Sequence, residues 1–448
     1  MLRVAVVGSG PSGVYAAQAL VQQTAVPDVR VHILDRLPCP YGLVRYGVAP
    51  DHEKIKSLQN NLRSVLEEER IEFLGNVEVG AHGLAPARLL ELYHAVVYCV
   101  GAARDRRLGI PGEDLPGSHS ATDFVSWYSA HPDALTGGFP LGGPSAVVIG
   151  VGNVAVDVAR ILARGADELR PTDVPEPALA ALAASGVRDV HMVGRRGPSG
   201  AKFTTKELRE LGALPGADVL VEPADLALET AYAHPEEVPA VVRRNLLVVR
   251  EWADRRPTGR ARRIHVRFFL RPVEVLERGG RAAGVRFERT VPDDRGGVRG
   301  TGTYEDIEAQ LVLRAVGYRG VPTDGLPFDT DRGIVPNAAG RVLRDGMPSP
   351  GEYVAGWIKR GPTGVIGTNR PCAKETVTSL LEDAAQLAAR PVAADPLAEL
   401  RASGHRPVAW PGWLSIETAE EALGRTLGRR SVKIADWQGL LAAAERTD

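Results

Sequence analysis

Cysteine is scarce in this sequence of 448 residues, and its spacing excludes several kinds of redox and metal site. The three cysteines, Cys39, Cys99 and Cys372, lie far apart, so the sequence contains no CxxC pair. Such pairs mark redox dithiols and zinc sites, and closely spaced cysteines hold iron–sulfur clusters. An odd, sparse set of cysteines also favours a reducing cytoplasm over a disulfide scaffold. We therefore expect a cytoplasmic protein without a metal site of its own.

Long apolar runs and a surplus of charge are also missing. No apolar run approaches the roughly 18 residues that a membrane-spanning helix needs. Lys and Arg total 54 against 55 for Asp and Glu, whereas proteins built to bind nucleic acid usually carry a strong basic excess. The chain enters a strand pattern at its first residues, which leaves no room for a signal or transit peptide. We expect neither a membrane nor a nucleic acid as partner.

Two segments share the pattern of strand, glycine turn and helix. The first has an apolar strand from Val4 to Val7, a turn, and a helix pattern from Val14 to Leu20. The second has an apolar strand from Ala146 to Ile149, a turn, and a helix pattern from Val154 to Leu162. Each is typical of the opening of a doubly wound nucleotide-binding fold. Two openings about 140 residues apart predict two related nucleotide domains.

The first turn, GSGPSG, contains Gly8, Gly10, Ser12 and Gly13. Glycines at this spacing allow a tight turn, close approach of a pyrophosphate, and close packing of helix on strand. The strand that follows ends in Asp35, and an acid there accepts hydrogen bonds from ribose hydroxyls and repels a 2′-phosphate. This site fits FAD, or NAD, better than NADPH; a lone glycine motif, by contrast, is often a plain turn.

The second turn contains Gly150, Gly152, Asn153, Val154 and Ala155, with alanine in place of the third glycine. The next strand ends in Arg195 and Arg196, where the first segment has its acid. A guanidinium pair suits a dianionic phosphate, which predicts NADP(H) at this site. The alternative is a pair of solvated surface arginines. An FAD site and an NADP site in one chain indicate a two-nucleotide oxidoreductase.

Two further apolar strands, each followed by a glycine, flank the second segment. They are Ala95 to Val100, before Gly101, and Gln310 to Val316, before Gly317. We interpret them as the places where the chain leaves the first domain and returns to it. The expected fold is α/β, with two Rossmann-like doubly wound nucleotide-binding domains, the NADP domain inserted within the FAD domain. The expected boundaries are 1–103 and 319–448 for the FAD domain and 104–318 for the NADP domain.

Three other regions carry structural expectations. The Pro, Gly and Ala-rich stretch 165–186 is expected to be a surface excursion, and 290–303 is expected to form hairpin turns. Helical periodicity near the end of the chain predicts helices over 375–387, 418–427 and 434–445.

The segment YGLVRYGVAPDH, from Tyr41 to His52, is far more specific than either glycine motif. It closely resembles the adrenodoxin reductase family, which includes bacterial ferredoxin–NADP reductases of that type. The resemblance continues through IPGE at 110–113, GNVAVDVAR at 152–160, FTTKELREL at 203–211 and GWIKRGPTGVIGTN at 356–369. It spans essentially the whole chain and implies an FAD-dependent enzyme that carries electrons from NADPH to a small iron–sulfur protein.

The resemblance also implies roles for particular residues. It implies FAD contacts at Ser12, Asp35, Leu43 and Val79, with Trp357, Gly364, Val365 and Ile366 near the isoalloxazine ring. It implies NADP contacts at Gly152, Asn153, Val154, Ala155, Arg195, Arg196, Glu207 and Gly364. His52 and Glu210 match positions near the reacting rings, and Asp157 is a third candidate.

Hydride transfer between stacked rings mainly demands geometry. We therefore expect His52 and Glu210 to position groups and balance charge. For His52 the alternative is a structural hydrogen bond in a loop, and for Asp157 a helix–loop hydrogen bond. The chain departs from relatives at Asp35, where glutamate is frequent, at Glu53, where proline is frequent, and at 370–372.

A basic segment from Val242 to Pro272 holds ten arginines and two acidic residues. In a nearly neutral protein this predicts an acidic partner, and we expect ferredoxin to dock near Arg243 and Arg244. The alternative is a solvated strand and loop surface. We further expect a monomer, with haem-thiolate monooxygenases among the possible users further downstream. A two-electron NADPH-dependent flavoprotein and a nucleotide-sensing module without activity are the competing functions.

Overall fold

The computed structural model describes residues 1–446, which divide into two compact units. Unit 1 comprises residues 1–48, 52–104 and 318–448, and unit 2 comprises residues 49–51 and 105–317. The short segment 49–51 belongs to unit 2 although its neighbours in sequence belong to unit 1. No helix in residues 1–446 combines the length and the apolar character that crossing a membrane requires.

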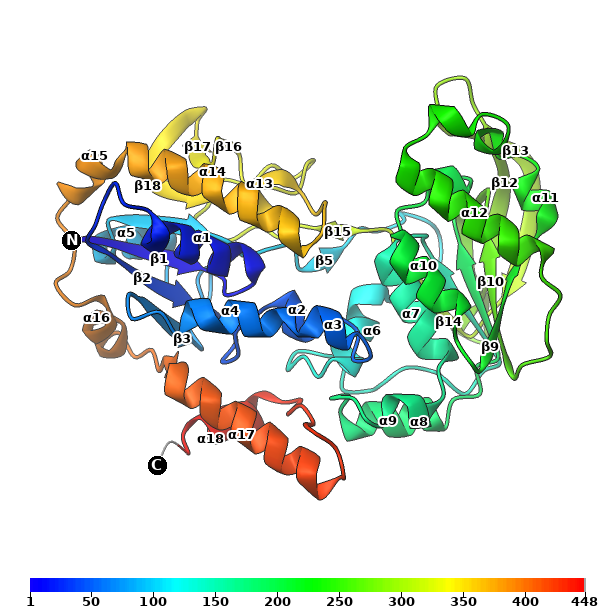
Figure 1. Ribbon diagram of the computed structural model, residues 1–448, viewed down its shortest axis with the longest axis horizontal. Coiled ribbons are helices and arrows are strands. Elements are labelled where there is room, and N and C mark those ends of the chain that lie inside the picture. Colours follow the sequence, from blue (N-terminus) through cyan, green and yellow to red (C-terminus); the bar gives the residue numbers. More distant parts are fainter. Residues whose placement is uncertain (447–448) are drawn as a thin grey trace. The chain divides into compact units, whose positions relative to one another are not determined.

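Unit 1 is built on an eight-stranded sheet in the order β16-β17-β18-β4-β1-β2-β3-β19 (Figure 1). Strands β18, β4, β1, β2 and β3 run parallel, and the outer strands pair antiparallel. The strands are β1 (Leu2–Val7), β2 (Val29–Leu34), β3 (Ile71–Gly75), β4 (Ala95–Tyr98), β16 (Asn337–Ala338), β17 (Arg341–Arg344), β18 (Met347–Val354) and β19 (Val408–Ala409). Val4 and Val6 of β1 face one buried cluster, and Ala5 and Val7 face another, because successive side chains of a strand alternate between its faces. Both faces of the sheet are therefore covered, as is usual for parallel strands.

Helices pack on both sides of this sheet, and α14 lies along α1 (Figure 1). The helices of unit 1 are α1 (Pro11–Gln22), α2 (Leu43–Tyr46), α3 (Glu53–Lys56), α4 (Leu58–Leu66), α5 (Pro86–Leu92), α13 (Trp357–Arg360), the 3₁₀ turn η4 (Ile366–Thr368), α14 (Asn369–Glu382), α15 (Ala384–Ala388), α16 (Pro396–Ala402), α17 (Trp410–Thr426) and α18 (Trp437–Ala444). The helices expected near the end of the chain are confirmed, although 375–387 is divided between α14 and α15.

Unit 2 is built on a six-stranded parallel sheet in the order β6-β14-β7-β8-β10-β9. Its strands are β6 (Ser118–Ser120), β7 (Ser145–Ile149), β8 (Asp189–Val193), β9 (Ala217–Val221), β10 (Arg262–Arg267) and β14 (Leu311–Arg314). An antiparallel sheet of β11 (Leu270–Arg278), β12 (Arg281–Pro292) and β13 (Val298–Glu308) adds a second layer. The short strands β5 (Arg104–Asp105) and β15 (Tyr318–Arg319) pair with each other where the chain crosses between the units.

The two faces of the parallel sheet in unit 2 are covered by different layers. Ala146 and Val148 of β7 face a cluster formed with helices, whereas Val147 and Ile149 face Val285 and Phe287 of the antiparallel sheet and their neighbours. The helices and 3₁₀ turns are α6 (Ala121–Tyr128), α7 (Asn153–Ala163), α8 (Ala166–Leu169), α9 (Glu176–Ala183), η1 (Pro198–Gly200), α10 (Thr205–Gly212), α11 (Pro223–Leu226), η2 (Thr230–Tyr232), η3 (Pro235–Glu237) and α12 (Ala240–Asp254).

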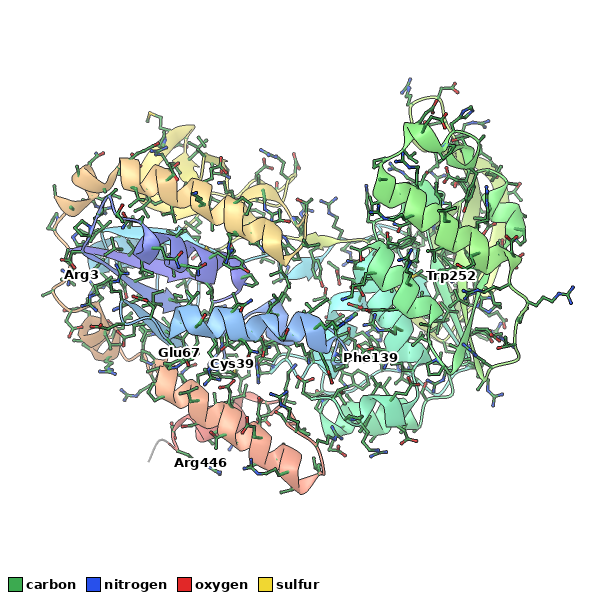
Figure 2. The ribbon with its side chains drawn as sticks, viewed as in Figure 1. Arg3, Cys39, Glu67, Phe139, Trp252 and Arg446 are labelled. Atoms are coloured by element: carbon green, nitrogen blue, oxygen red, sulfur yellow. The ribbon has the colours of Figure 1, made fainter. Side chains whose placement is uncertain are left out.

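Three local expectations need correction. Residues 165–186 are not a surface excursion, because they form α8 and α9 and bury Val174, Leu179 and Leu182 in the core of unit 2. Residues 290–303 are mostly strand, and the turn is confined to residues 293–297. The arginines from 243 to 250 lie on the helix α12, not on a strand or loop. The apolar spacing of α12 buries Leu246, Val249 and Trp252, the last of which Figure 2 labels.

Candidate functional site

The first glycine turn joins β1 to α1 in unit 1. Gly8 has a φ of +107°, and a Cβ there would lie 2.5 Å from the carbonyl oxygen of Cys99, so this position requires glycine. A Cβ at Gly13 would lie 1.9 Å from the carbonyl oxygen of Gly8. Because glycine has no side chain, α1 can pack directly on the turn. The space in front of Gly10 is open, and its nearest neighbour there is the Cα of Gly42 at 3.9 Å. A pyrophosphate could approach the backbone here, at the start of the 12-residue helix α1.

Asp35 follows β2 directly and is held against the glycine turn. Its Oδ2 accepts hydrogen bonds from the backbone N and the Oγ of Ser9, at 2.8 and 2.5 Å, and its Oδ1 accepts one from the N of Leu37 at 2.9 Å. Burial raises the pKa of Asp35, and the bonds from Ser9 and Leu37 oppose that rise. A carboxylate offers about four lone-pair sites, so roughly one remains for a ribose hydroxyl.

The other residues expected around FAD come from distant parts of unit 1. A Cβ at Gly356, whose φ is +79°, would lie 2.3 Å from the Oγ of Ser12, so the start of α13 packs on the start of α1. Trp357 follows, 5.4 Å from the ring of Tyr318. The Nε1 of Trp357 is buried and has no hydrogen-bond acceptor within residues 1–446. An unsatisfied buried donor beside the glycine turn fits a cofactor that carries acceptor atoms.

Leu43, Val79 and the 364–366 loop complete the residues expected at FAD. Leu43 begins α2 and is 38% exposed, and Val79 forms an isolated bridge with Leu84. Gly364 has a φ of +82°, and a Cβ there would lie 2.6 Å from the Oγ1 of Thr368. This turn therefore gives a local reason for the glycine, besides the room that it would leave for a nicotinamide. Val365 is exposed, and its N donates to the Oγ1 of Thr368.

The second glycine turn joins β7 to α7 in unit 2 and repeats the geometry of the first. Gly150 has a φ of +141°, and a Cβ there would lie 2.3 Å from the carbonyl oxygen of Ala315. The space in front of Gly152 is open. Asn153 begins α7, and its Oδ1 accepts a hydrogen bond from the N of Thr204 at 2.8 Å. Val154 and Ala155 follow within α7, and Ala155 is fully buried.

Arg195 and Arg196 follow β8 and are exposed, at the place where unit 1 has Asp35. Their backbone oxygens accept hydrogen bonds from Thr290 and Phe269, which fixes the loop. Neither guanidinium forms an ion pair within the described residues. Two cations without an ion-pair partner among the described residues, carried on an anchored loop, fit a 2′-phosphate at this position.

Two acidic candidates of unit 2, Asp157 and Glu207, gather around one buried arginine, Arg160. Its Nε and one terminal nitrogen donate to the carboxylate of Asp51 at 2.7 and 3.0 Å, and the Oδ1 of Asp157 lies 2.8 Å away. The Oε2 of Glu207 is 3.7 Å from the guanidinium, and Arg164 also contacts Asp51. Burial alone would lower the pKa of Arg160, but the carboxylates of Asp157 and Asp51 hold it above its ordinary value. The guanidinium thus stays charged and holds three carboxylates together.

The remaining candidates differ in their surroundings. Glu210 is on the more exposed side of α10, where it pairs with Lys206 at 3.7 Å, so Glu207 and not Glu210 lies in the Arg160 cluster. His52 is buried and precedes α3, and its carbonyl oxygen accepts from the N of Ile55 and Lys56. The catalytic roles expected for His52, Glu210 and Asp157 stay predictions.

Sequence reasoning missed Gly42, Asp51, Arg160 and Lys202 as parts of these sites. Gly42, Asp51 and Arg160 lie within motifs that carry the resemblance, and that position was the one available signal. The contacts that give them a role join residues far apart in the sequence, as between Asp51 and Arg160.

Comparison with known proteins identifies the family. Residues 2–206 match the family model described as pyridine nucleotide-disulphide oxidoreductase. The chain is 47% identical to the NADPH-ferredoxin reductase FprA of Mycobacterium tuberculosis over 98% of both chains. It belongs to the ferredoxin–NADP reductases of the adrenodoxin reductase type. The mitochondrial NADPH:adrenodoxin oxidoreductase of Arabidopsis thaliana is 40% identical over 99% of this chain and 95% of its own. The structure of Mycobacterium tuberculosis FprA in complex with NADPH matches with a TM-score of 0.93 and 44% identity, over 99% of both chains.

This ferredoxin–NADP reductase therefore has the α/β fold expected from its sequence, and the family and the cofactor pair FAD and NADP(H) are those that its motifs predicted. Unit 1 supplies a glycine turn with a partly buried acid and an unsatisfied indole donor. Unit 2 supplies a glycine turn with two free guanidinium groups. The residues present fit FAD in the first and NADP(H) in the second.

Proposed function

We propose that this chain oxidises NADPH and passes the electrons through FAD to a small iron–sulfur protein of the ferredoxin or adrenodoxin type. One observation carries the proposal: two glycine turns of the same geometry are each followed by a strand with opposite charge at its end, Asp35 in unit 1 and Arg195 with Arg196 in unit 2. Two different nucleotides are thereby selected within one chain. FAD, when bound, accepts a hydride and releases its two electrons singly.

The residues of the chain bind and orient in this scheme. Gly10 and Gly152 leave room for the two pyrophosphates, and the helices α1 and α7 direct backbone N–H groups at them. Arg195 and Arg196 take the 2′-phosphate of NADPH and discriminate against NADH. Arg160 holds the carboxylates of Asp157 and Glu207 in fixed positions, so these groups need no reorganisation when the substrate arrives.

Rapid mixing of the FAD-loaded enzyme with NADPH or NADH, without oxygen, tests the proposal. We expect NADPH to bleach the flavin much faster than NADH does. Subsequent addition of a stoichiometric ferredoxin should restore the flavin absorbance as the ferredoxin is reduced. Bleaching without reduction of ferredoxin would assign the enzyme to the two-electron flavoproteins. A protein that takes up no FAD would favour a module without activity.

The surface of α10 and α12 supports docking of an acidic ferredoxin. A groove of about 280 Å³ between these helices is lined by residues that include Arg209, Arg244, Arg255 and Leu247. Leu247 is 66% exposed, so an apolar contact point stands among exposed cations. Arg243 instead donates to the carbonyl oxygens of Val238 and Pro235, which occupies it in holding the loop before α12. We therefore propose that Arg244 contributes more to ferredoxin docking than Arg243 does.

Two substitutions separate the charged and apolar parts of this surface. Arg244→Glu should raise the KM for ferredoxin by about tenfold at low salt, with little effect at high salt, because exposed charges are screened. Leu247→Ser should lower kcat/KM for ferredoxin at every salt concentration. A small dye should be reduced at the unchanged rate by both variants. Arg278→Glu, on the exposed edge of the antiparallel sheet, is the control. Equal effects of Arg244→Glu on ferredoxin and dye would refute docking here.

We propose that the enzyme works in the cytoplasm. All three cysteines are buried and unpaired, which fits a reducing cytoplasm. We propose a monomer, to be checked by light scattering of the FAD-loaded protein, and a haem-thiolate monooxygenase as one possible final acceptor. Reconstitution of the electron-transfer chain with such an enzyme would test the last point.

A further inference from the structure

The segment from Ala201 to Thr204 runs alongside the second glycine turn. The N of Lys202 donates to the carbonyl oxygen of Val151 at 2.8 Å, and Lys202 forms an isolated parallel bridge with Gly152. Two residues later, the N of Thr204 donates to the Oδ1 of Asn153. Hydrogen bonds from Lys202 and from Thr204 therefore hold the backbone of this segment against the turn.

The side chain of Lys202 borders the open space in front of Gly152. A Cβ placed on Gly152 would have a single heavy-atom neighbour within 4 Å, the Cβ of Lys202 at 3.9 Å. Lys202 is exposed, and its ammonium group makes no hydrogen bond or ion pair within residues 1–446. Lys206, one helical turn further on, is different because it pairs with Glu210.

We propose that Lys202 binds the pyrophosphate of NADP(H), as a third cation beside Arg195 and Arg196. The inference rests on the proposed NADP site of unit 2. The space before Gly152 is where a pyrophosphate meets the start of α7, and a lysine is a flexible point charge suited to phosphate. A charge-assisted hydrogen bond from the ammonium group adds affinity that the backbone alone does not supply.

This role differs from that of the arginine pair in one measurable respect. The pyrophosphate is common to NADP(H) and NAD(H), whereas the 2′-phosphate belongs to NADP(H) alone. Lys202 should therefore contribute equally to both dinucleotides, and Arg195 and Arg196 should contribute to NADP(H) only. A fragment with a 2′-phosphate but no pyrophosphate, 2′-AMP, should depend on the arginines and not on Lys202.

Calorimetric titration of the oxidised, FAD-loaded enzyme with NADP⁺, NAD⁺ and 2′-AMP tests the inference without turnover. Lys202→Ala should weaken NADP⁺ and NAD⁺ by a similar factor, about 5- to 20-fold, and leave 2′-AMP unchanged. Lys202→Arg should retain most of the affinity. The matched control Lys206→Ala should change no affinity by more than about twofold. FAD content and Tm should stay those of the wild type in all three variants.

Three outcomes would overturn the inference. Unchanged binding of NADP⁺ to Lys202→Ala would show that the ammonium group does not reach the ligand. An equal loss for 2′-AMP would move Lys202 to the 2′-phosphate. An equal loss for Lys206→Ala would indicate a long-range effect of positive charge on dinucleotide binding and not a direct contact with Lys202. Wild-type enzyme that binds no NADP⁺, or that binds it no more tightly than Arg195→Ala/Arg196→Ala, would instead refute the proposed NADP site itself.

Discussion

The two glycine turns repeat one backbone plan and differ in what surrounds it. In both, the first glycine lies against the carbonyl oxygen of a neighbouring strand's end, and the second faces open space. A Cβ placed on this second glycine would lie 3.9 Å from the Cα of Gly42 in unit 1 and 3.9 Å from the Cβ of Lys202 in unit 2, so only the second turn has a residue with a cationic side chain beside it. The second strand is followed by a partly buried acid in unit 1 and by two exposed arginines in unit 2. The first turn is thus bordered by backbone, whereas the second is bordered by exposed positive charge.

Substitutions at the third position of the glycine motif should show the largest difference in stability between the two units. Gly13→Ala places a Cβ 1.9 Å from the backbone oxygen of Gly8, so α1 must move away from the turn. We expect this variant to cost at least about 3 kcal/mol and to be purified without FAD. Ala155→Gly creates no clash in unit 2 and should cost about 1 kcal/mol, the usual penalty of glycine in a helix. The absorbance of bound flavin and the Tm measure both effects.

The outcome decides whether the two turns differ as the geometry indicates. Full FAD loading of Gly13→Ala would mean that α1 shifts freely, and the contrast between Gly13 and Ala155 would then carry no functional weight.

The buried arginines offer the second comparison. In unit 1, Arg45 pairs with Glu420 at 2.6 Å and lies 5.0 Å from the rings of both Tyr46 and Trp413. In unit 2, Arg160 holds Asp51, Asp157 and Glu207. Removing one partner of a buried pair typically costs about 3–5 kcal/mol, because a charge stays behind without compensation. Arg160→Met leaves several carboxylates together, so its loss of stability should lie at the upper end of this range. Arg45→Met leaves one carboxylate, so its loss should lie at the lower end.

A second substitution identifies the source of the cost. Asp51→Asn should recover part of the stability lost in Arg160→Met, since it removes one of the stranded charges, and urea unfolding of the single and double variants measures this coupling. Strict additivity of the two substitutions would contradict the cluster. Arg170→Met, at an exposed position after α8, is the control.

The sequence was informative wherever the chemistry is local. The glycine turns were visible in the sequence because a strand, a turn and a helix follow one another within about 20 residues. Asp35, Arg195 and Arg196 were visible because each stands directly after the next strand of its unit. Three contacts could not be predicted, because each depends on how distant segments of the chain pack. They are Gly42 opposite Gly10, Lys202 beside Gly152, and the hydrogen bond from Arg160 to Asp51. The stretch 165–186 was misjudged for the same reason. Its Pro, Gly and Ala content resembles a loop, yet its few apolar residues are buried by the core of unit 2.

The equivalent strands β2 and β8 allow a finer comparison, because each carries one histidine. His32 lies 2.9 Å from the Oη of Tyr93, and Glu72, Asp395 and Arg3 are its charged neighbours. His191 stacks on His265 with ring centroids 4.5 Å apart, near Asp189, Arg267 and Glu305. Burial, as the largest cause, lowers the pKa of both His32 and His191 to about 4.

Both histidines should therefore destabilise their units in acid. Each is neutral in the folded protein at neutral pH, and its lowered pKa means that the unfolded chain binds the proton more readily. Their contribution to stability is complete above the ordinary pKa of about 6.5 and is lost as pH falls from there through about 4. Between about pH 7 and pH 5 we expect a loss of roughly 1–2 kcal/mol for each histidine. Urea unfolding of the wild type and of His32→Phe and His191→Phe measures it.

Each phenylalanine variant should flatten the pH dependence of the unit that contains it, since an aromatic ring of similar shape remains but no proton is bound. His234→Gln, which replaces an exposed histidine, should leave the pH dependence unchanged. If His191→Phe lost as much stability in acid as the wild type, His191 would accept a proton in the folded protein without a cost in stability. Strands β2 and β8 would then differ in the protonation of their histidines, as well as in the charge of the residues that follow them. If both variants flattened the curve equally, the strands would share one environment, and the difference between the units would be confined to the turn and the residues that face it.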